Sequence, residues 1–269
     1  MQRPTLKLTL KTRILLTISL WLLALLFSSC STNIQFSNQP ESTQYVIVPK
    51  PLKPSHKTSA SQKKQQFFAY LKPIVISENN RILHLRQQLM HLKETTALDQ
   101  HQLSWLQHIA ADYNVSMATH PGYEQWRQLL DRVDIVPLEM ALAQAANESA
   151  WGQSRFARQG NNYFGQWCYQ KGCGLVPKQR AGGAHHEVRR FTSPTQSVRA
   201  YLRNINRSTA YAEFRAIRHS LRVQRKPLDA QRLAVGLKSY SERGMAYVRT
   251  IQTMIRSNRQ LILQSPTDS

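Results

Sequence analysis

The stretch Pro137–Gly152 reads PLEMALAQAANESAWG and decides how the second half of the chain folds. Pro137 suits the first turn of a helix, where its missing N–H and fixed φ cost nothing. Small and apolar residues then recur at helical spacing, namely Leu138, Ala141, Leu142, Ala145 and Ser149. We therefore predict a helix whose body is buried in the protein.

One carboxylate, Glu148, lies in this apolar helix. A buried acid costs stability unless it is paired or is useful in its neutral form. We expect the apolar Trp151 to raise the pKa of Glu148 and keep it protonated near neutral pH, as a general acid for glycoside cleavage requires. The alternative is an ion pair between Glu148 and Arg155 or Arg158, with no chemistry.

A second segment, Asn161–Trp167 (NNYFGQW), combines aromatic rings with amides. Rings of this kind stack on sugars, and amides hydrogen-bond hydroxyl and acetamido groups. The expected substrate-binding residues are Trp151, Asn162, Tyr163, Phe164 and Trp167. We place Trp167 in a groove, whereas Trp151 is as compatible with the core as with a groove wall.

Together these segments resemble the bacterial glucosaminidase family of peptidoglycan hydrolases, glycoside hydrolase family 73. The family's Ala/Gln-rich helix with Glu-Ser-x-Trp-Gly corresponds to Gln144–Gly152, and its Asn-x-Phe-Gly corresponds to Asn162–Gly165. The resemblance covers roughly residues 133–258, which suits one compact domain. It implies a lysozyme-like domain that binds peptidoglycan glycan strands and hydrolyses O-glycosyl bonds as an endo-β-N-acetylglucosaminidase.

The expected fold class is α+β and mostly α, a helical domain with a small β-hairpin lobe, preceded by a helical extension. We expect the extension at 66–132, with two or three helices between Phe67 and Asn114, and the catalytic domain at 133–262. Its later elements are a hairpin at 182–191, a helix opened by Ser193-Pro194 and reaching Tyr211, a helix capped by Asp229 and ending at Leu237, and a last helix at 245–258.

Cleavage also needs a group on the opposite face of the sugar, which is a base, a nucleophile or the substrate's own acetamido oxygen. Glu187, in the expected hairpin, is the first candidate, and the family is thought to use an acid from this lobe. A surface pair with Arg189 is the alternative. The resemblance also suggests Tyr240 as a groove-lining catalytic residue, although Tyr240–Gly244 departs from the family pattern and a packed Tyr is equally compatible. Glu242 could supply the carboxylate if Glu187 does not.

Two other functions remain open. A wall-binding protein would use the same groove without a competent second carboxylate. A lytic transglycosylase would need only one Glu, because the sugar's own hydroxyl attacks.

Residues 1–30 are typical of an export signal, with a basic start and an apolar run at Ile14–Phe27 that is short for a membrane-spanning helix. The end of the run resembles a lipobox, which predicts lipidation at Cys30 and an outer-membrane lipoprotein facing the periplasm. An inner-membrane anchor and an ordinary cleaved signal, which would release the protein into the periplasm, are the alternatives. Residues 31–65, rich in Ser, Thr, Gln, Pro and Lys, predict a flexible tether.

In an exported protein Cys168 and Cys173 predict a local disulfide. A zinc site with His185 and His186 is the less favoured alternative, because the spacing does not match. The net charge of +21 favours anionic partners, and export argues against nucleic acid. We expect a monomer that touches the wall and the membrane and holds neither cofactor nor metal.

Overall fold

The computed structural model describes residues 59–178, 183 and 185–264. The expected signal peptide, Cys30 and most of the expected tether lie outside the described residues. Within the described ranges, no helix combines the length and the apolar character needed to cross a membrane.

The described chain opens with one long helix, α2 (Ala60–Glu94). Ser59 caps it, and Gln62 completes a reciprocal capping box, so the helix begins before the expected tether end at residue 65. The helix runs through Pro73, so the prediction of two or three helices between Phe67 and Asn114 is met by α2 and α3 (Gln100–Asp112) alone. A buried stripe along α2 explains this continuity, because tertiary burial outweighs the local cost of the proline.

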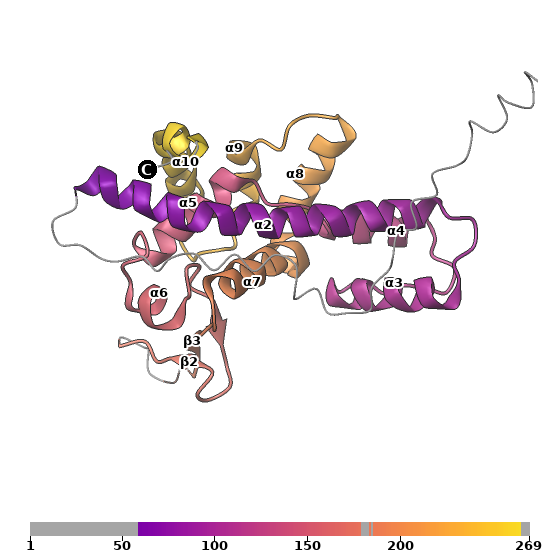
Figure 1. Cartoon of the computed structure of the whole chain (residues 1–269), viewed down its shortest axis with the longest axis horizontal. Helices are drawn as coiled ribbons and strands as arrows, with labels where there is room; N and C mark the ends of the chain where they lie inside the picture. The colour runs from indigo at the N-terminus through magenta and orange to yellow at the C-terminus, as the bar shows by residue number, and fades with distance from the viewer. Residues whose placement is uncertain (1–58, 179–182, 184, 265–269) are drawn as a thin grey trace, which may run out of the picture. The chain divides into compact units, whose positions relative to one another are not determined.

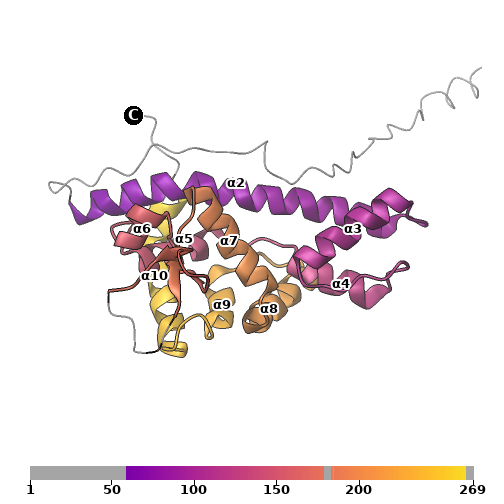
Figure 2. The same cartoon turned by 90° about the horizontal axis from the view of Figure 1, so that it is seen from below.

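Helix α2 lies across the helices that follow it, as Figures 1 and 2 show from two directions, and packs against α5 (Leu138–Ser149), α7 (Pro194–Arg207) and α10 (Met245–Leu263). A fully buried acid, Glu78, fixes the contact with α7. Its two oxygens accept hydrogen bonds from Arg199 at 2.7 and 2.9 Å, and Arg81 on α2 donates to the same carboxylate at 3.0 Å. The extension is therefore clamped onto the domain that carries Glu148.

The remaining helical elements complete the helical body. They are α4 (Tyr123–Arg132), α6 (Arg155–Gly160), the 3₁₀ turn η2 (Thr209–Tyr211), α8 (Ala212–Val223), α9 (Ala230–Leu233) and the 3₁₀ turn η3 (Ala234–Leu237). Among them, α9 contacts α5. Ser193 caps α7 and Asp229 caps α9, as the sequence predicts. The expected helix to Tyr211 breaks at Ser208 into a 3₁₀ turn, and the last helix runs five residues beyond Asn258.

Three arginines converge on the buried Asp134, which precedes α5. Arg222 donates to both carboxylate oxygens at 2.7 and 2.9 Å, while Arg218 and Arg86 lie within 3.9 Å. Burial alone would raise the pKa of Asp134, but the Arg222 hydrogen bonds and the charges of Arg218 and Arg86 lower it overall. This cluster joins α2 and α8 to the start of the α5 helix.

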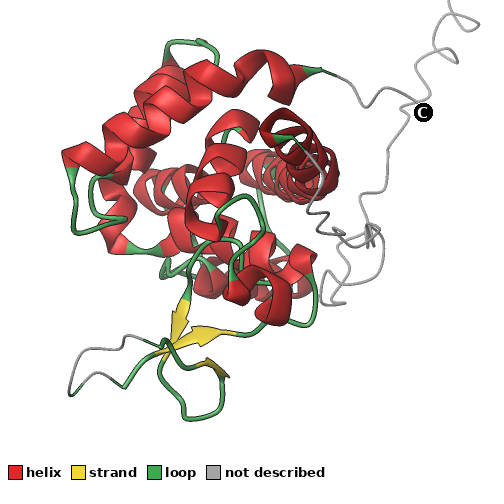
Figure 3. Cartoon of the chain, turned by 90° about the vertical axis from the view of Figure 1, so that its left-hand side faces the viewer, coloured by secondary structure: helices red, strands yellow, loops and turns green. Residues whose placement is uncertain are grey.

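The β lobe is a three-stranded antiparallel sheet of β1 (Trp167–Cys168), β2 (Gly174–Leu175) and β3 (Glu187–Arg189), in the order β1-β3-β2 (Figure 3). The expectation of a hairpin within 182–191 is corrected, because that region supplies one central strand whose partners are β1 and β2. The mostly helical body with this small sheet confirms the predicted α+β, lysozyme-like fold class.

Candidate active site

Glu148 lies in the last turn of α5, where the helix is stopped by its own side chains. The Ser149 hydroxyl donates to the Ala145 carbonyl at 2.6 Å and accepts the Gly152 N–H at 2.8 Å. Ala150 and Trp151 then adopt left-handed backbone angles, with φ of 50° and 58°. The chain turns sharply at this point, so the carboxylate sits at the end of a buried helix.

Both hydrogen bonds to the Glu148 carboxylate reach the same oxygen. Oε1 accepts from Asn147 Nδ2 at 3.0 Å and from the Tyr247 hydroxyl at 2.8 Å. In the described ranges Glu148 forms no ion pair, and Arg155 instead donates to the Val176 carbonyl. The expected alternative, a carboxylate neutralised by a helix arginine, is therefore not what the structure shows.

The second oxygen, Oε2, faces Gly165. An ideal Cβ at Gly165 would lie 3.6 Å from Oε2, and the backbone φ of +67° suits glycine. Because the Asn-x-Phe-Gly motif has glycine here, this position places no side chain against Oε2.

A chain of buried polar side chains orients Tyr247. The Tyr201 hydroxyl donates to Gln144 Oε1 at 2.6 Å, and Gln144 Nε2 donates to the Tyr247 hydroxyl at 3.0 Å. Because Tyr247 accepts from the amide, its own proton is left for Glu148. Burial, and then the nearby Glu148, raises the pKa of Tyr247, so the phenol remains a donor at neutral pH.

Sequence reasoning missed Tyr247, Gln144 and Tyr201. The available signal was Gln144, an amide one helical turn before Glu148 on a helix otherwise lined by alanine and leucine. Tyr240, the tyrosine that the sequence suggests, instead donates its hydroxyl to the Phe164 carbonyl at 2.8 Å. Its ring stacks on Tyr247 with centroids 5.4 Å apart, so Tyr240 supports the residue that contacts the acid.

Three of the expected substrate-binding residues are buried, which corrects the expectation that they face the substrate. Asn162 is 1% exposed, and its amide group bonds the backbone of Phe164, Gln166 and Arg189. Phe164 stacks on Tyr201 with centroids 3.9 Å apart.

Tyr163, the third buried residue, packs beside Phe67 and Tyr70 of α2. The side chains of Asn162, Tyr163 and Phe164 therefore stabilise the conformation of this loop through contacts inside the protein.

The two tryptophans have different environments. Trp151 makes edge contacts with Phe67 and Phe68 of α2, with ring centroids 5.8 and 5.5 Å apart, and so belongs to the packing between α2 and the domain. Trp167 is 55% exposed and stacks on His186 with centroids 3.9 Å apart. Of the expected aromatic contacts, Trp167 is the one available to a sugar ring.

Glu187 is tied into the β lobe. It is 6% exposed, and its two oxygens accept the N–H groups of Gly172 and Gly174 at 2.9 and 2.7 Å. The expected surface pair with Arg189 is corrected, because Arg189 lies over the Phe191 ring. A carboxylate held by two backbone amides is poorly suited to hold an attacking water, so its catalytic role remains a prediction that this geometry disfavours.

The loop that Glu187 holds is closed by a disulfide between Cys168 and Cys173. Joined sulfurs cannot serve as zinc thiolates, and His186 is engaged by Trp167. Glu242, the reserve carboxylate, is exposed in the loop before α10.

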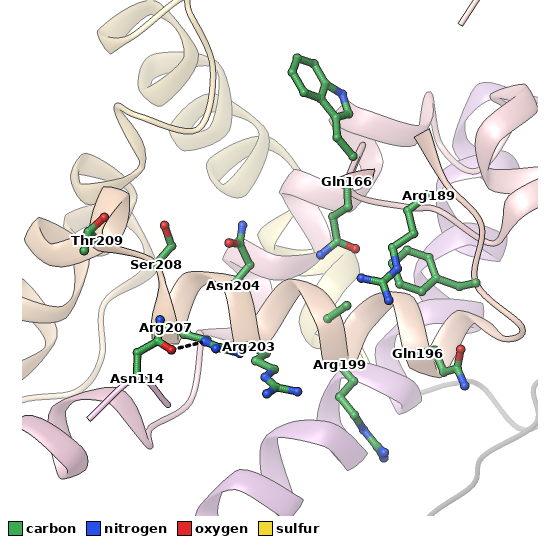
Figure 4. A pocket seen from close by; sticks show the side chains of 13 residues that line it. Asn114, Gln166, Arg189, Gln196, Arg199, Arg203, Asn204, Arg207, Ser208 and Thr209 are labelled. Atoms are coloured by element: carbon green, nitrogen blue, oxygen red, sulfur yellow. Dashed lines mark hydrogen bonds between the residues drawn. The ribbon is translucent and has the colours of Figure 1, made fainter. Parts of the chain in front are cut away.

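A groove with a volume of about 920 Å³ begins one residue beyond Gly165 (Figure 4). Gln166, Trp167, Arg189 and Phe191 form one side, and residues of α7 form the other. Gly165, whose ideal Cβ would lie 3.6 Å from Glu148 Oε2, directly precedes Gln166 of the groove lining, and the groove runs along α7.

The sequence matches known proteins over the region that contains this site. Residues 123–260 match the family model described as Glucosaminidase: Mannosyl-glycoprotein endo-beta-N-acetylglucosaminidase. Protein bax of Escherichia coli (strain K12) is 32% identical over 204 residues, which are 76% of this chain and 73% of that protein. No solved structure matches the chain. The matched range contains both sequence motifs and the whole hydrogen-bonded chain from Gln144 to Tyr247.

Proposed function

The chain belongs to the glucosaminidase family, a family of peptidoglycan-related glycosidases, and on that premise we propose that it hydrolyses the glycan strand of peptidoglycan as an endo-β-N-acetylglucosaminidase. Glu148 is the general acid in this proposal. The main observation in its support is that the two oxygens of the Glu148 carboxyl group differ. Oε1 accepts both hydrogen bonds, and Oε2 lies beside Gly165.

Tyr247 and Asn147 both donate to Oε1, so a proton on Glu148 is held by Oε2. Oε2 is the oxygen beside Gly165, the residue that precedes Gln166 of the groove lining. A glycosidic oxygen bound beside Gly165 would take its proton from Oε2 as the bond to the anomeric carbon breaks. Tyr247 and Asn147 then stabilise the carboxylate that remains, because hydrogen bonds to a charged acceptor are the stronger kind.

Glu187 is the sole acid between Glu148 and Glu213 in the sequence, and its oxygens are already bonded to backbone amides. We therefore propose that the group on the opposite face of the sugar comes from the substrate, namely the acetamido oxygen of the N-acetylglucosamine unit. A reaction with one protein carboxylate also fits a lytic transglycosylase. Because both oxygens of Glu187 accept backbone N–H groups, the lytic transglycosylase reaction is a better second candidate than hydrolysis by two carboxylates.

Product analysis tests the proposal. Purified sacculi would be digested with the full-length protein, and the soluble fragments would be reduced and identified by mass spectrometry. Hydrolysis at N-acetylglucosamine predicts fragments with reducing N-acetylglucosamine ends. Anhydro sugars would replace the proposal by the lytic reaction, and the absence of any fragment, with binding retained, would leave a wall-binding protein.

We also propose that the chain works from the periplasmic face of the outer membrane, held by a lipid on Cys30. The signal-like residues 1–30 support this placement, and the glycan strand lies within reach of a protein tethered there.

A further inference from the structure

The groove along α7 is lined by four arginines and contains no acid in its lining. Two of the four are neutralised by acids of the helical extension. Arg199 pairs with Glu78 at 2.7 Å, and Arg203 pairs with Asp112 at 2.8 Å. In Figure 4 both side chains leave α7 on the side away from Gln166. They contribute to the fold more than to the charge inside the groove.

The other two arginines of the lining, Arg189 and Arg207, are not neutralised in this way. Neither forms an ion pair with any residue in the described ranges. Arg189 lies over the Phe191 ring, and Arg207 uses Nε to donate to Asn114 Oδ1 at 2.8 Å. Their terminal guanidinium nitrogens are suited to planar anions such as carboxylates. In Figure 4 they stand toward opposite ends of the lining, Arg189 beside Gln166 and Arg207 beside Asn114.

An amide between them lacks a partner. Gln166 Oε1 is buried with no hydrogen bond, a costly state for a polar atom. The Gln166 side chain extends from the loop toward α7, near Asn204 (Figure 4). Because Gln166 also lines the groove, its amide is placed to meet a polar group of a ligand. Two separated cations with amides between them suit a peptide that carries several carboxylates.

We infer that this groove binds the stem peptide of peptidoglycan, with Arg189 and Arg207 holding its carboxylates and Gln166 bonding its backbone. The inference rests on the proposed function, because it places peptide beside the point at which Glu148 cleaves the glycan. It makes peptide-bearing strands the preferred ligand over strands whose peptides have been removed. General attraction of a basic protein to an anionic polymer would give no such preference.

Binding measured in a Glu148→Gln background tests this without requiring cleavage. The probes are glycan strands from sacculi, the same strands after amidase removal of their peptides, and the released peptides as competitor. Amidase leaves a lactyl carboxylate on each muramic acid, so the two strands separate peptide carboxylates from sugar carboxylates. The test variant is Arg189→Gln with Arg207→Gln. The control is Arg249→Gln with Arg259→Gln, which removes the same charge from exposed positions on α10.

In the test variant we expect the ratio of affinities for peptide-bearing and amidase-treated strands to fall by at least about tenfold. This is the scale of two charge-assisted contacts. The control variant should keep that preference, and Lys at both test positions should restore part of it. Released peptide should compete in the parent and not in the test variant.

Equal losses in both variants, or a larger loss on the amidase-treated strands, would overturn the inference. The proposed function fails separately, because it requires cleavage by the protein with Glu148 intact.

Discussion

The Tyr247 hydroxyl donates a hydrogen bond to Glu148 Oε1 at 2.8 Å, across 99 residues of sequence. The two side chains belong to α10 and α5, which pack against each other in the core. Gln144 and Tyr201 fix the direction of this bond. The position of the acid thus depends on the packing of the last helix as much as on its own helix.

Replacing Tyr247 by Phe should therefore impair turnover while the protein stays folded. The change removes one donor to a charged acceptor, which is worth about 1.5–3 kcal/mol, so we expect kcat on sacculi to fall roughly 10- to 100-fold. Tyr240→Phe is the matched control, because it removes a neighbouring stacked hydroxyl that bonds the Phe164 carbonyl instead. A larger loss of kcat in the Tyr240 variant would show that the wrong tyrosine has been assigned to Glu148.

Gly165→Ala should reduce activity by two separate effects. The backbone φ of +67° strains an alanine by about 1–2 kcal/mol, and the new methyl group would rest on Oε2. Gly172→Ala separates the effects, since Gly172 also has a positive φ but nothing within 4 Å of its ideal Cβ. Similar losses of thermal stability in both variants, with activity lost only in Gly165→Ala, are expected. Full activity in Gly165→Ala would mean that Oε2 does not face the substrate.

Acid should weaken the fold through Asp134. The arginines around it lower its folded-state pKa, so its contribution is complete above the unfolded value of about 3.9 and is lost as the pH falls through the lowered folded-state pKa. Asp134→Asn should cost about 3 kcal/mol or more at pH 7, because it leaves buried arginines uncompensated. Urea unfolding between pH 7 and pH 3 measures both effects. A parent protein and an Asn variant that lose stability in parallel below pH 4 would rule out this role.

Cys30→Ala should abolish lipid labelling and release the protein from the membrane fraction, or leave it mislocalised. The measurement is incorporation of labelled fatty acid together with fractionation of envelopes. Cys30→Ala protein that labels and fractionates like the parent would refute the lipoprotein proposal. Neighbouring Ser29→Ala serves as a control for the general effect of altering the signal region.

Much of the helical fold was predictable, because periodicity and capping residues are local. Ser193, Pro194 and Asp229 mark helix starts in the sequence as they do in the structure. The number of helices between Phe67 and Asn114 was left at two or three, and the structure has two, because the buried stripe on both sides of Pro73 keeps α2 continuous. The sheet was simplified because β3 pairs with strands that precede it by many residues.

In the site, Glu148 and the motif loop were predictable from their residue types, but side-chain directions were not. The Trp151 ring turns toward α2 because Ala150 and Trp151 adopt left-handed angles that non-glycine residues rarely take. The Asn162 and Phe164 side chains were expected to meet sugar, yet their partners come from strand β3 and helix α7. Tyr247 was missed because only the folded chain brings it to the acid.

In the proposed reaction Glu148 delivers a proton to the glycosidic oxygen. The most direct test of this step is the rate of sacculus digestion by Glu148→Gln, beside Glu139→Gln as a control acid in the first turn of the same helix. We expect a loss of at least about 100-fold for Glu148→Gln with binding and melting temperature retained, and near-parental rates for Glu139→Gln. Near-parental digestion by a folded Glu148→Gln protein would contradict this role of Glu148.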